Sequence, residues 1–426
     1  LELLVNYSMS SEMVILPLFV GTAFSSASGS SGAVCRYVPL RLLSSKEVFS
    51  AVRSIKDTNQ LLCRAPARRH LFSLGGVPRY FVNYVERVLK NPEITIEVMD
   101  RAFQRVQTDW VKFWSKAFKP PQLVKLIAQS LSGQPVILSN CPEGFSQTWQ
   151  QLRDRSVCII STEGLITLPY AVLCLCKDVK FAKYVTSEAE KCLVKTLRML
   201  FDSVDNQMAS EPWVLWETFG AIFYALRINA LMVIGEKEVP FSTIISGADF
   251  TGCNVYVTLH PMLVERSAEK YSTTMPNKIG IRADPAIKKE WKQMENEHGY
   301  VWLNGSNGEG VDIFFALPQT SSDSYVICVD QRKRVPRPLG KKTASDLLEM
   351  ANILPELCSK DILVRGLCNV LPSYKDVVPE NCFIVSATNT KAFHTSLAFH
   401  PAATPTIDIN HDDVSYLKLV LNSSAE

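Results

Sequence analysis

The stretch from Gly310 to Arg334, GVDIFFALPQTSSDSYVICVDQRKR, constrains the fold more than any other part of the chain. Two strongly apolar runs, VDIFFALP and SYVICVDQ, flank the polar turn PQTSSDS, which predicts two antiparallel strands joined as a hairpin. Asp312 opens the first run, and the second run ends in DQRKR. A hairpin would therefore bring Asp312 beside the end of the second strand, opposite Gln331 and Lys333.

The polar end of the second strand has residues on both faces. Gln331 and Lys333 project together, while Asp330 and Arg332 project to the other side. A carboxylate, an amide oxygen and a lysine at the end of a sheet suit Mg²⁺ or Mn²⁺, which activates water against a phosphodiester. Lys333 would orient that water or stabilise the charge on phosphate. The alternative is a strand that runs out into solvent.

A further carboxylate, Glu217, lies in the apolar and aromatic run PWVLWETFGAIFYAL. Residues Trp213 to Val233 are predicted to form a long amphipathic helix. An acid in such a helix is costly without a partner such as a metal or a base, and no charged residue lies at helical spacing from it. Two interpretations stay open: a metal ligand, or a partly exposed acid favoured by the helix dipole.

The segment from 206 to 426 is predicted to be α/β. GCNVYVTLH and NCFIVSATN are expected strands, and TASDLLEMANILPEL fits a helix that precedes the last strand. A basic cluster follows the hairpin and comprises Arg332, Arg334, Arg337, Lys341 and Lys342. This cluster would contact nucleic-acid phosphate, act as a nuclear localisation signal, or form a solvated loop.

The preceding segments have a different pattern. Residues 1 to 95 contain strand-like and helix-like pieces of an α/β unit whose opening strands are missing, and 96 to 205 are mainly helical. Within the latter, WQQLRDRSVCIISTEGLITLPYAVLCLC predicts a short helix followed by two strands, similar to a winged helix. Its turn carries Glu163 and no base, so a packing or linker module is favoured over DNA contact.

Composition adds a few bounds. A chain of 426 residues predicts two or three domains. With 45 basic and 42 acidic residues, affinity for nucleic acid would need local basic patches. Twelve cysteines without paired CxxC boxes indicate reduced core residues and a reducing intracellular environment. No apolar run reaches the roughly 20 residues of a membrane span, so no membrane partner is expected.

The chain is expected to be a fragment or to lack its natural N-terminus, because it begins with Leu1. No signal peptide is expected from its short apolar run VILPLFVGTAF. The histidines His394, His400 and His411 have no serine or cysteine in an elbow-like turn beside them, so a hydrolase triad is not supported.

The order of elements resembles the restriction-endonuclease-like core of the PD-(D/E)xK superfamily in a QxK variant. That order is a helix with Glu217, a strand, a strand with Asp312, a strand with Gln331 and Lys333, a helix and a strand. The resemblance implies that these four residues are catalytic, with Glu217, Asp312 and Gln331 as metal ligands. Val311 replaces the proline before the acid, and Gln331 replaces an acid, which reduces the negative charge for a metal.

A second resemblance concerns the N-terminal third. VILPLFVGT followed by LFSLGGVPRYFVNYV is similar to the late strand and lid region of P-loop ATPase domains in Crinkler effectors and retrotransposon-hot-spot proteins. The implied organisation is a partial P-loop NTPase-like α/β unit over 1–95, then a helical linker with a winged-helix-like part over 96–205. A restriction-endonuclease-like mixed sheet flanked by helices would follow over 206–426.

The expected ATPase phosphate loop is not found. LGKKT, the only Gly-Lys pair, lacks the earlier glycine of GxxxxGK[ST], so ATP binding is not expected and Arg79 is expected to be structural.

The resemblance implies a metal-dependent DNA endonuclease that acts in a nucleus, in one version the nucleus of a host cell after secretion. The alternative is a decayed nuclease fold that binds DNA or a host protein. A third possibility, an ATPase regulator, would need a phosphate loop upstream.

Overall fold

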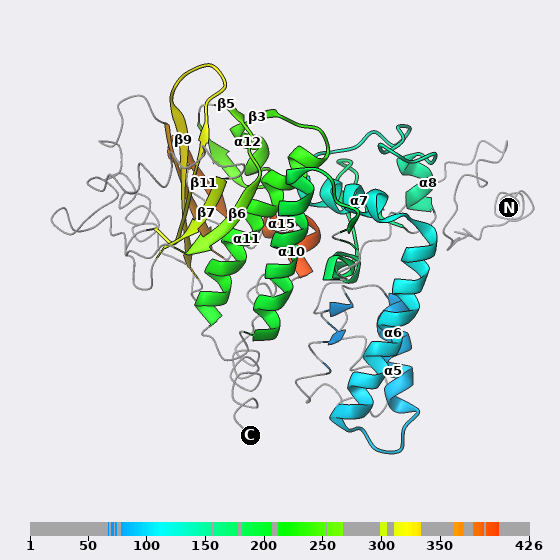
Figure 1. Ribbon diagram of the computed structural model, residues 1–426. Helices are drawn as coiled ribbons and strands as arrows, with labels where there is room; N and C mark the ends of the chain where they lie inside the picture. Colours follow the sequence, from blue (N-terminus) through cyan, green and yellow to red (C-terminus); the bar gives the residue numbers. More distant parts are fainter. Residues whose placement is uncertain are drawn as a thin grey trace, which may run out of the picture.

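The computed structural model describes residues 67, 70, 71, 73, 74, 78–154, 157–177, 181, 183–206, 212–252, 254–266, 299–304, 311–333, 362–369, 378–386 and 389–399. These residues form a mixed α/β fold with a seven-stranded mixed sheet at one side and a helical arm at the other (Figure 1). The predicted α/β class is confirmed at this level. The predicted ATPase-like remnant lies largely outside the described residues.

The large sheet has the strand order β4-β11-β10-β9-β8-β7-β6. Its strands are β4 (Asp249–Thr251), β6 (Met262–Arg266), β7 (Gly299–Leu303), β8 (Ile313–Pro318), β9 (Tyr325–Lys333), β10 (Ile362–Asn369) and β11 (Cys382–Val385). Pairings β7/β8, β8/β9 and β11/β4 are antiparallel, and β6/β7, β9/β10 and β10/β11 are parallel. The hairpin of β8 and β9 and the strand β11 confirm the sequence prediction, whereas β4, β6, β7 and β10 were not anticipated.

One predicted strand belongs elsewhere. Within GCNVYVTLH only β5 (Tyr256–Thr258) is a strand, and it pairs with β3 (Glu238–Pro240) in a separate two-stranded sheet. The helix predicted over 343–357 lies outside the described residues.

Helix α11 (Pro212–Val233) runs through the middle of the molecule. The predicted helix is confirmed, but its expected amphipathic character is wrong, because every residue from 218 to 231 is buried. The sheet covers one side of α11, while α7 (Pro120–Ser132) and α10 (Glu188–Asn206) cover the other. A helix enclosed in this way is apolar on all sides. No helix in the described part of the chain is both long and apolar enough to cross a membrane.

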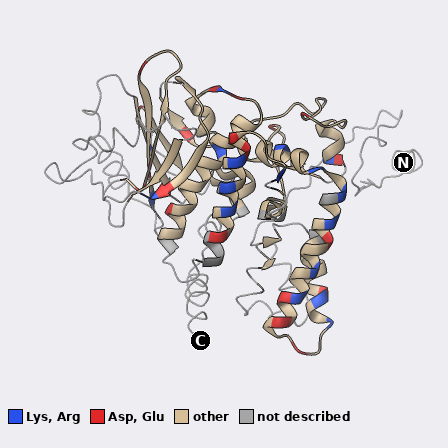
Figure 2. Ribbon diagram, viewed as in Figure 1, with Lys and Arg blue, Asp and Glu red and all other residues tan. Residues whose placement is uncertain are grey.

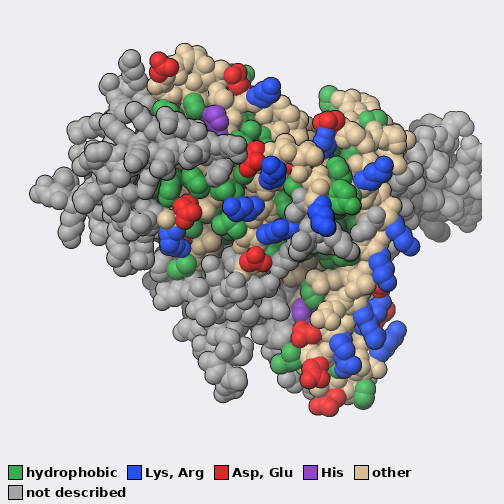
Figure 3. All heavy atoms as spheres, in the orientation of Figure 1, with side chains coloured by type: hydrophobic (Ala, Val, Ile, Leu, Met, Phe, Trp, Pro, Cys, Tyr) green, Lys and Arg blue, Asp and Glu red, His purple; other side chains and the backbone are tan. Residues whose placement is uncertain are grey.

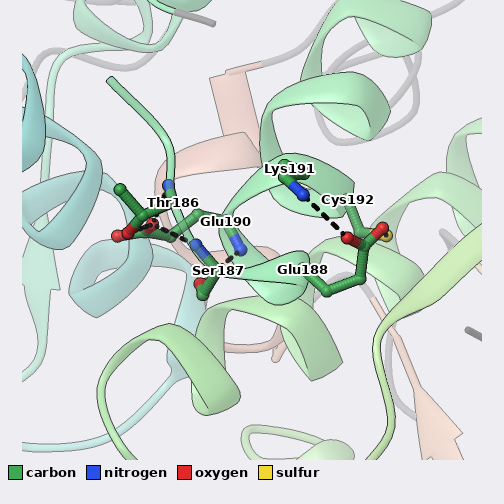
Figure 4. Close-up of polar contacts among 6 residues, drawn as sticks. All are labelled: Thr186, Ser187, Glu188, Glu190, Lys191 and Cys192. Carbon is green, nitrogen blue, oxygen red and sulfur yellow. Dashed lines mark hydrogen bonds and ion pairs between the residues drawn. The ribbon is translucent and has the colours of Figure 1, made fainter. Parts of the chain in front are cut away.

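The start of α10 is fixed by a capping box (Figure 4). The Glu190 amide donates to Ser187 Oγ at 3.2 Å, and Glu190 Oε2 accepts the amides of Ser187 at 3.0 Å and Thr186 at 2.8 Å. Partial burial alone would raise the pKa of Glu190, but these hydrogen bonds lower it below its usual value. The box satisfies amides that the first turn of a helix leaves without partners.

The helical arm consists of α5 (Pro78–Leu89) and α6 (Ile96–Ala117), with Thr95 Oγ1 capping α6 through the Val98 amide at 3.2 Å. Its connection to α10 contains α8 (Trp149–Asp154), β1 (Ile159–Ile160), β2 (Ile166–Thr167), α9 (Tyr170–Leu173) and η1 (Cys174–Lys177). The helix followed by a hairpin is confirmed, but YAVLCLC is helical instead of extended. The likeness to a winged helix stays a prediction.

Arg227 of α11 joins distant parts of the core. Its guanidinium donates to the carbonyl of Leu131 at 3.2 Å, to that of Ser246 at 2.8 Å, and to that of Phe393. The side chain is fully buried, with Cζ 4.7 Å from the Phe223 ring centre. A buried charge needs such partners.

Arg227 therefore links three segments: the end of α7, the turn after α12 (Phe241–Ile244), and α15 (Thr390–His394), which leads into η6 (Thr395–Phe399). One continuous buried apolar cluster extends from Ala67 to Leu397. The core thus crosses the boundary predicted near residue 205, and the predicted domain limits stay predictions.

The cysteines within the described ranges are free thiols, most of them buried. This agrees with the expectation of reduced core residues.

Candidate functional site at the ends of β8 and β9

The start of β8 lies beside the end of β9. Their register runs from Ile313 opposite Asp330 to Pro318 opposite Tyr325. Asp312, just before β8, donates its amide to the Asp330 carbonyl at 3.1 Å, and its Oδ2 accepts the Arg332 amide at 2.6 Å. Asp312 therefore lies where the hairpin prediction expected it, and its carboxylate accepts a β9 amide at the point where β8 begins and β9 ends.

Asp330 and Arg332 project toward α11 and form a buried ion pair. Arg332 Nε lies 3.0 Å from Asp330 Oδ2, and neither side chain has exposed surface. The same carboxylate oxygen accepts the Tyr224 hydroxyl at 2.9 Å and contacts Cys368 Sγ at 3.5 Å. Such a pair requires additional hydrogen bonds to offset the loss of hydration.

This environment suppresses ionisation of the acidic groups around the carboxylate. Burial, followed by the charge of Asp330, raises the pKa of Tyr224 and of the Cys328 and Cys368 thiols well above their usual values. Burial by itself lowers the pKa of Arg332, but the acidic groups beside it raise that pKa above its ordinary value. The guanidinium therefore stays charged, and the two thiols stay neutral.

Arg332 fits beneath α11 because residue 220 is glycine. A Cβ atom at Gly220 would lie 2.6 Å from Arg332 Cδ and closer still to Nε and Cζ. The guanidinium carbon lies 4.7 Å from the Trp216 ring centre, a cation–π contact. Arg332 Nη1 and Nη2 find no hydrogen-bond acceptor, and Asp330 Oδ1 finds no donor, in the described part of the chain.

Arg332 was expected to contact nucleic-acid phosphate, and the structure instead buries it completely. Alternation along β9 turns its side chain toward α11 and away from solvent. The other expected phosphate contacts, Arg334, Arg337, Lys341 and Lys342, lie outside the described residues. Lys333 ends β9, and its side chain is also outside the description.

Gln331 occupies the face of β9 opposite to Asp330 and Arg332. Its side chain is 5% exposed, and its Oε1 atom has no hydrogen-bond donor within the described residues. The same face carries a smaller apolar cluster that includes Trp302, Phe314 and Val329. A buried amide oxygen that lacks a donor is costly in such surroundings.

Glu217 is half-buried on α11, one helical turn before Gly220. It therefore lies near Gly220, the residue of α11 that packs against Arg332, and on the side of the sheet to which Asp330 projects. Gln331 projects from the other face. Asp312 and Gln331 are thus brought together at one strand end, whereas Glu217 and Gln331 are separated by the sheet.

The acidic groups of the described residues do not form a larger cluster. Over the ranges that the structure describes, no group of three or more His, Cys, Asp and Glu side chains is arranged to hold a metal ion. The buried Asp330–Arg332 pair was missed from sequence, although Gly220 in an otherwise bulky helix was a signal of close approach.

Comparison of the chain with family models, with curated proteins and with solved structures gave no match.

Proposed function

We propose that the protein is a metal-dependent DNA endonuclease of the Crinkler and retrotransposon-hot-spot type, with its site at the ends of β8 and β9. The observation that carries this proposal is the meeting of Asp312 with the end of β9, next to Gln331 Oε1, which has no hydrogen-bond donor among the described residues. One carboxylate and one amide oxygen at a sheet end are ligands that Mg²⁺ or Mn²⁺ accepts.

The order of elements supports the same proposal. Helix α11 precedes β7, β8, β9 and β10 in sequence. The expected QxK pair, Gln331 and Lys333, lies at the end of β9. The strand expected first after the helix, GCNVYVTLH, corresponds to β5, which belongs to the separate two-stranded sheet, and the unanticipated β3, α12, β4 and β6 also lie between α11 and β7. The order from β8 to β9 agrees with the proposed nuclease core, with β7 in place of the expected first strand.

The proposal gives each residue a role. A bound metal would neutralise charge on the phosphodiester and lower the pKa of a water molecule. Asp312 and Gln331 would hold the metal. Glu217, the third expected ligand, lies across the sheet from Gln331, so it would contribute negative charge at a distance and not as a direct ligand. Lys333 would stabilise the negative charge that develops on phosphate. DNA is then the proposed partner, a nucleus the proposed location, and ATP is not required.

A second candidate function is a nuclease fold that has lost catalysis and binds DNA or a host protein. Two observations favour it. The described residues supply no cluster of three acidic or imidazole ligands, and Gln331 contributes no negative charge. A metal held by so little charge would bind weakly.

Plasmid nicking separates these functions. The purified chain should nick supercoiled DNA with Mg²⁺ or Mn²⁺ and not with EDTA. Asp312→Asn, which keeps a hydrogen-bond acceptor for the Arg332 amide, and Lys333→Ala should each reduce nicking by about 100-fold or more. Asp323→Asn, in the exposed turn between the strands, is the matched control and should nick normally. Equal nicking by all variants would refute the assignment, and DNA retention without nicking would favour the second function.

A further inference from the structure

The exposed face of α6 carries a row of four basic side chains. Arg101, Arg105, Lys112 and Lys116 are all exposed and follow one another at intervals of four, seven and four residues. These intervals place them on one face of a helix, within about 60° around its axis. Figure 2 shows basic residues along α6, and Figure 3 shows basic side chains along the edge of the molecule that the helical arm forms. We call these four residues the α6 basic row.

The rest of the helix holds this row in a fixed orientation. Met99, Val106, Trp110 and Trp114, on the opposite side of α6, are buried in the main core. Because α6 is capped at Thr95 and packed along its length, the basic row forms a straight line about 22 Å long.

The row is not neutralised by the acids of its own helix. Among the described residues, none of the four basic side chains takes part in an ion pair. Asp100 is engaged by His70 Nε2 at 3.2 Å, and Asp109 by Arg87 at 2.9 Å. Glu97 remains as the acid at the N-terminal end of the row. The positive charge is therefore available to an external anion, apart from this one end.

The geometry points to a linear polyanion. Cations about 6 Å and 10 Å apart match a phosphate backbone, in which each strand carries one charge per roughly 3.4 Å along the helix axis. Gln104 and Thr108 lie between the basic residues and are also exposed. Neutral side chains of these types commonly hydrogen-bond to phosphate oxygens.

A lipid surface fits the row less well. A helix that lies on a membrane inserts its apolar face between the lipids. Apart from the exposed Ile96 and Phe113, which are 17 residues apart, the apolar face of α6 is occupied by the protein core, so the helix presents no continuous apolar face to a membrane. We propose that the α6 basic row binds the phosphate backbone of nucleic acid without sequence preference. The row lies on the helical arm, away from the β8–β9 strand ends (Figure 1), so this inference does not rest on a working cleavage site.

Salt-dependent binding of a labelled 20-base-pair duplex, measured by fluorescence anisotropy in EDTA, tests the proposal. Each phosphate contact contributes about −0.9 to the slope of log K against log salt. Arg101→Gln/Arg105→Gln and Lys112→Gln/Lys116→Gln should each weaken binding and reduce the magnitude of the slope by about 2. Lys183→Gln/Lys237→Gln removes the same charge from exposed positions elsewhere and should leave the slope unchanged.

Three results would overturn the inference. These are unchanged slopes in both α6 variants, an equal decrease in the control, or binding of phosphatidylserine vesicles without binding of nucleic acid. Unchanged thermal midpoints would show that the variants remain folded. EDTA removes the metal that cleavage would need, so the binding test gives the same answer whether or not the protein is an active nuclease. An α6 variant that nicks DNA as the parent does, and whose slope of log K against log salt is unchanged, would refute the α6 inference and leave the proposed nuclease function standing.

Discussion

Replacement of Gly220 by alanine should destabilise this protein, although the same change stabilises most helices. In the middle of a helix, alanine is favoured over glycine by about 1 kcal/mol. Here the added Cβ would lie 2.6 Å from Arg332 Cδ and nearer to the guanidinium, whereas carbon atoms pack at about 3.5 to 4.0 Å. Either α11 must move off the sheet by more than about 1 Å, or Arg332 must leave its site.

The second outcome sets the size of the effect. Expulsion of Arg332 leaves the Asp330 carboxylate buried without its cation, and disruption of a buried pair in this way costs about 3 to 5 kcal/mol. After the helix preference is subtracted, the free energy of unfolding should fall by about 2 to 4 kcal/mol. Urea titrations followed by tryptophan fluorescence measure this free energy of unfolding. The signal is suitable because the Trp216 ring packs against the Arg332 guanidinium.

A double-mutant cycle identifies the cause. In an Asp330→Asn/Arg332→Ala background no side-chain atom beyond Cβ of residue 332 occupies the space below α11, so Gly220→Ala should cost little or stabilise by up to about 1 kcal/mol. The reasoning is refuted if Gly220→Ala is neutral or stabilising in the otherwise unchanged protein, or if its cost is the same in both backgrounds.

Two further predictions concern the capping box and the buried arginine. Glu190→Gln should destabilise the protein at pH 7, and the difference from the parent should shrink as the pH falls below about 4, because the lowered pKa of Glu190 stabilises the fold only while the carboxylate is ionised. Urea midpoints at pH 7 and at about pH 3 check this, and a difference that persists in acid would contradict it. Arg227→Met removes the donors of three buried carbonyls and should cost about 3 kcal/mol or more. A urea-derived loss below about 1 kcal/mol would show that the carbonyls find other donors.

The sequence was most informative where one local pattern decides the structure. Two apolar runs around a polar turn specify the β8–β9 hairpin, and this alone places Asp312 beside the end of β9. It was less informative for β10, where Arg365 and Gly366 interrupt the apolar run. It misled at YAVLCLC, because a short apolar run fits a buried helix and a strand equally well.

Sequence periodicity could not decide which face of β9 carries the buried charges. Alternation separated Asp330 and Arg332 from Gln331 and Lys333, but both faces of this strand are covered, so burial followed tertiary packing. The helix α11 covers the Asp330 face, and its glycine makes room for the guanidinium. The roles of Asp312, Gln331, Lys333 and Glu217 in a metal site stay predictions, of which the nicking experiment tests those of Asp312 and Lys333.

The hydrogen bonds of Arg227 also restrict the order in which a nascent chain can complete its core. Its acceptors lie 96 residues before it, 19 residues after it and 166 residues after it in sequence. During synthesis, the guanidinium cannot be fully satisfied until the segment around Phe393 has left the ribosome. In a nascent chain that ends before that point, one of the three acceptors of this buried charge is missing, so we expect water to reach the guanidinium. The hydrogen bonds of Arg227 are therefore completed late in synthesis, by residues near the end of the described chain.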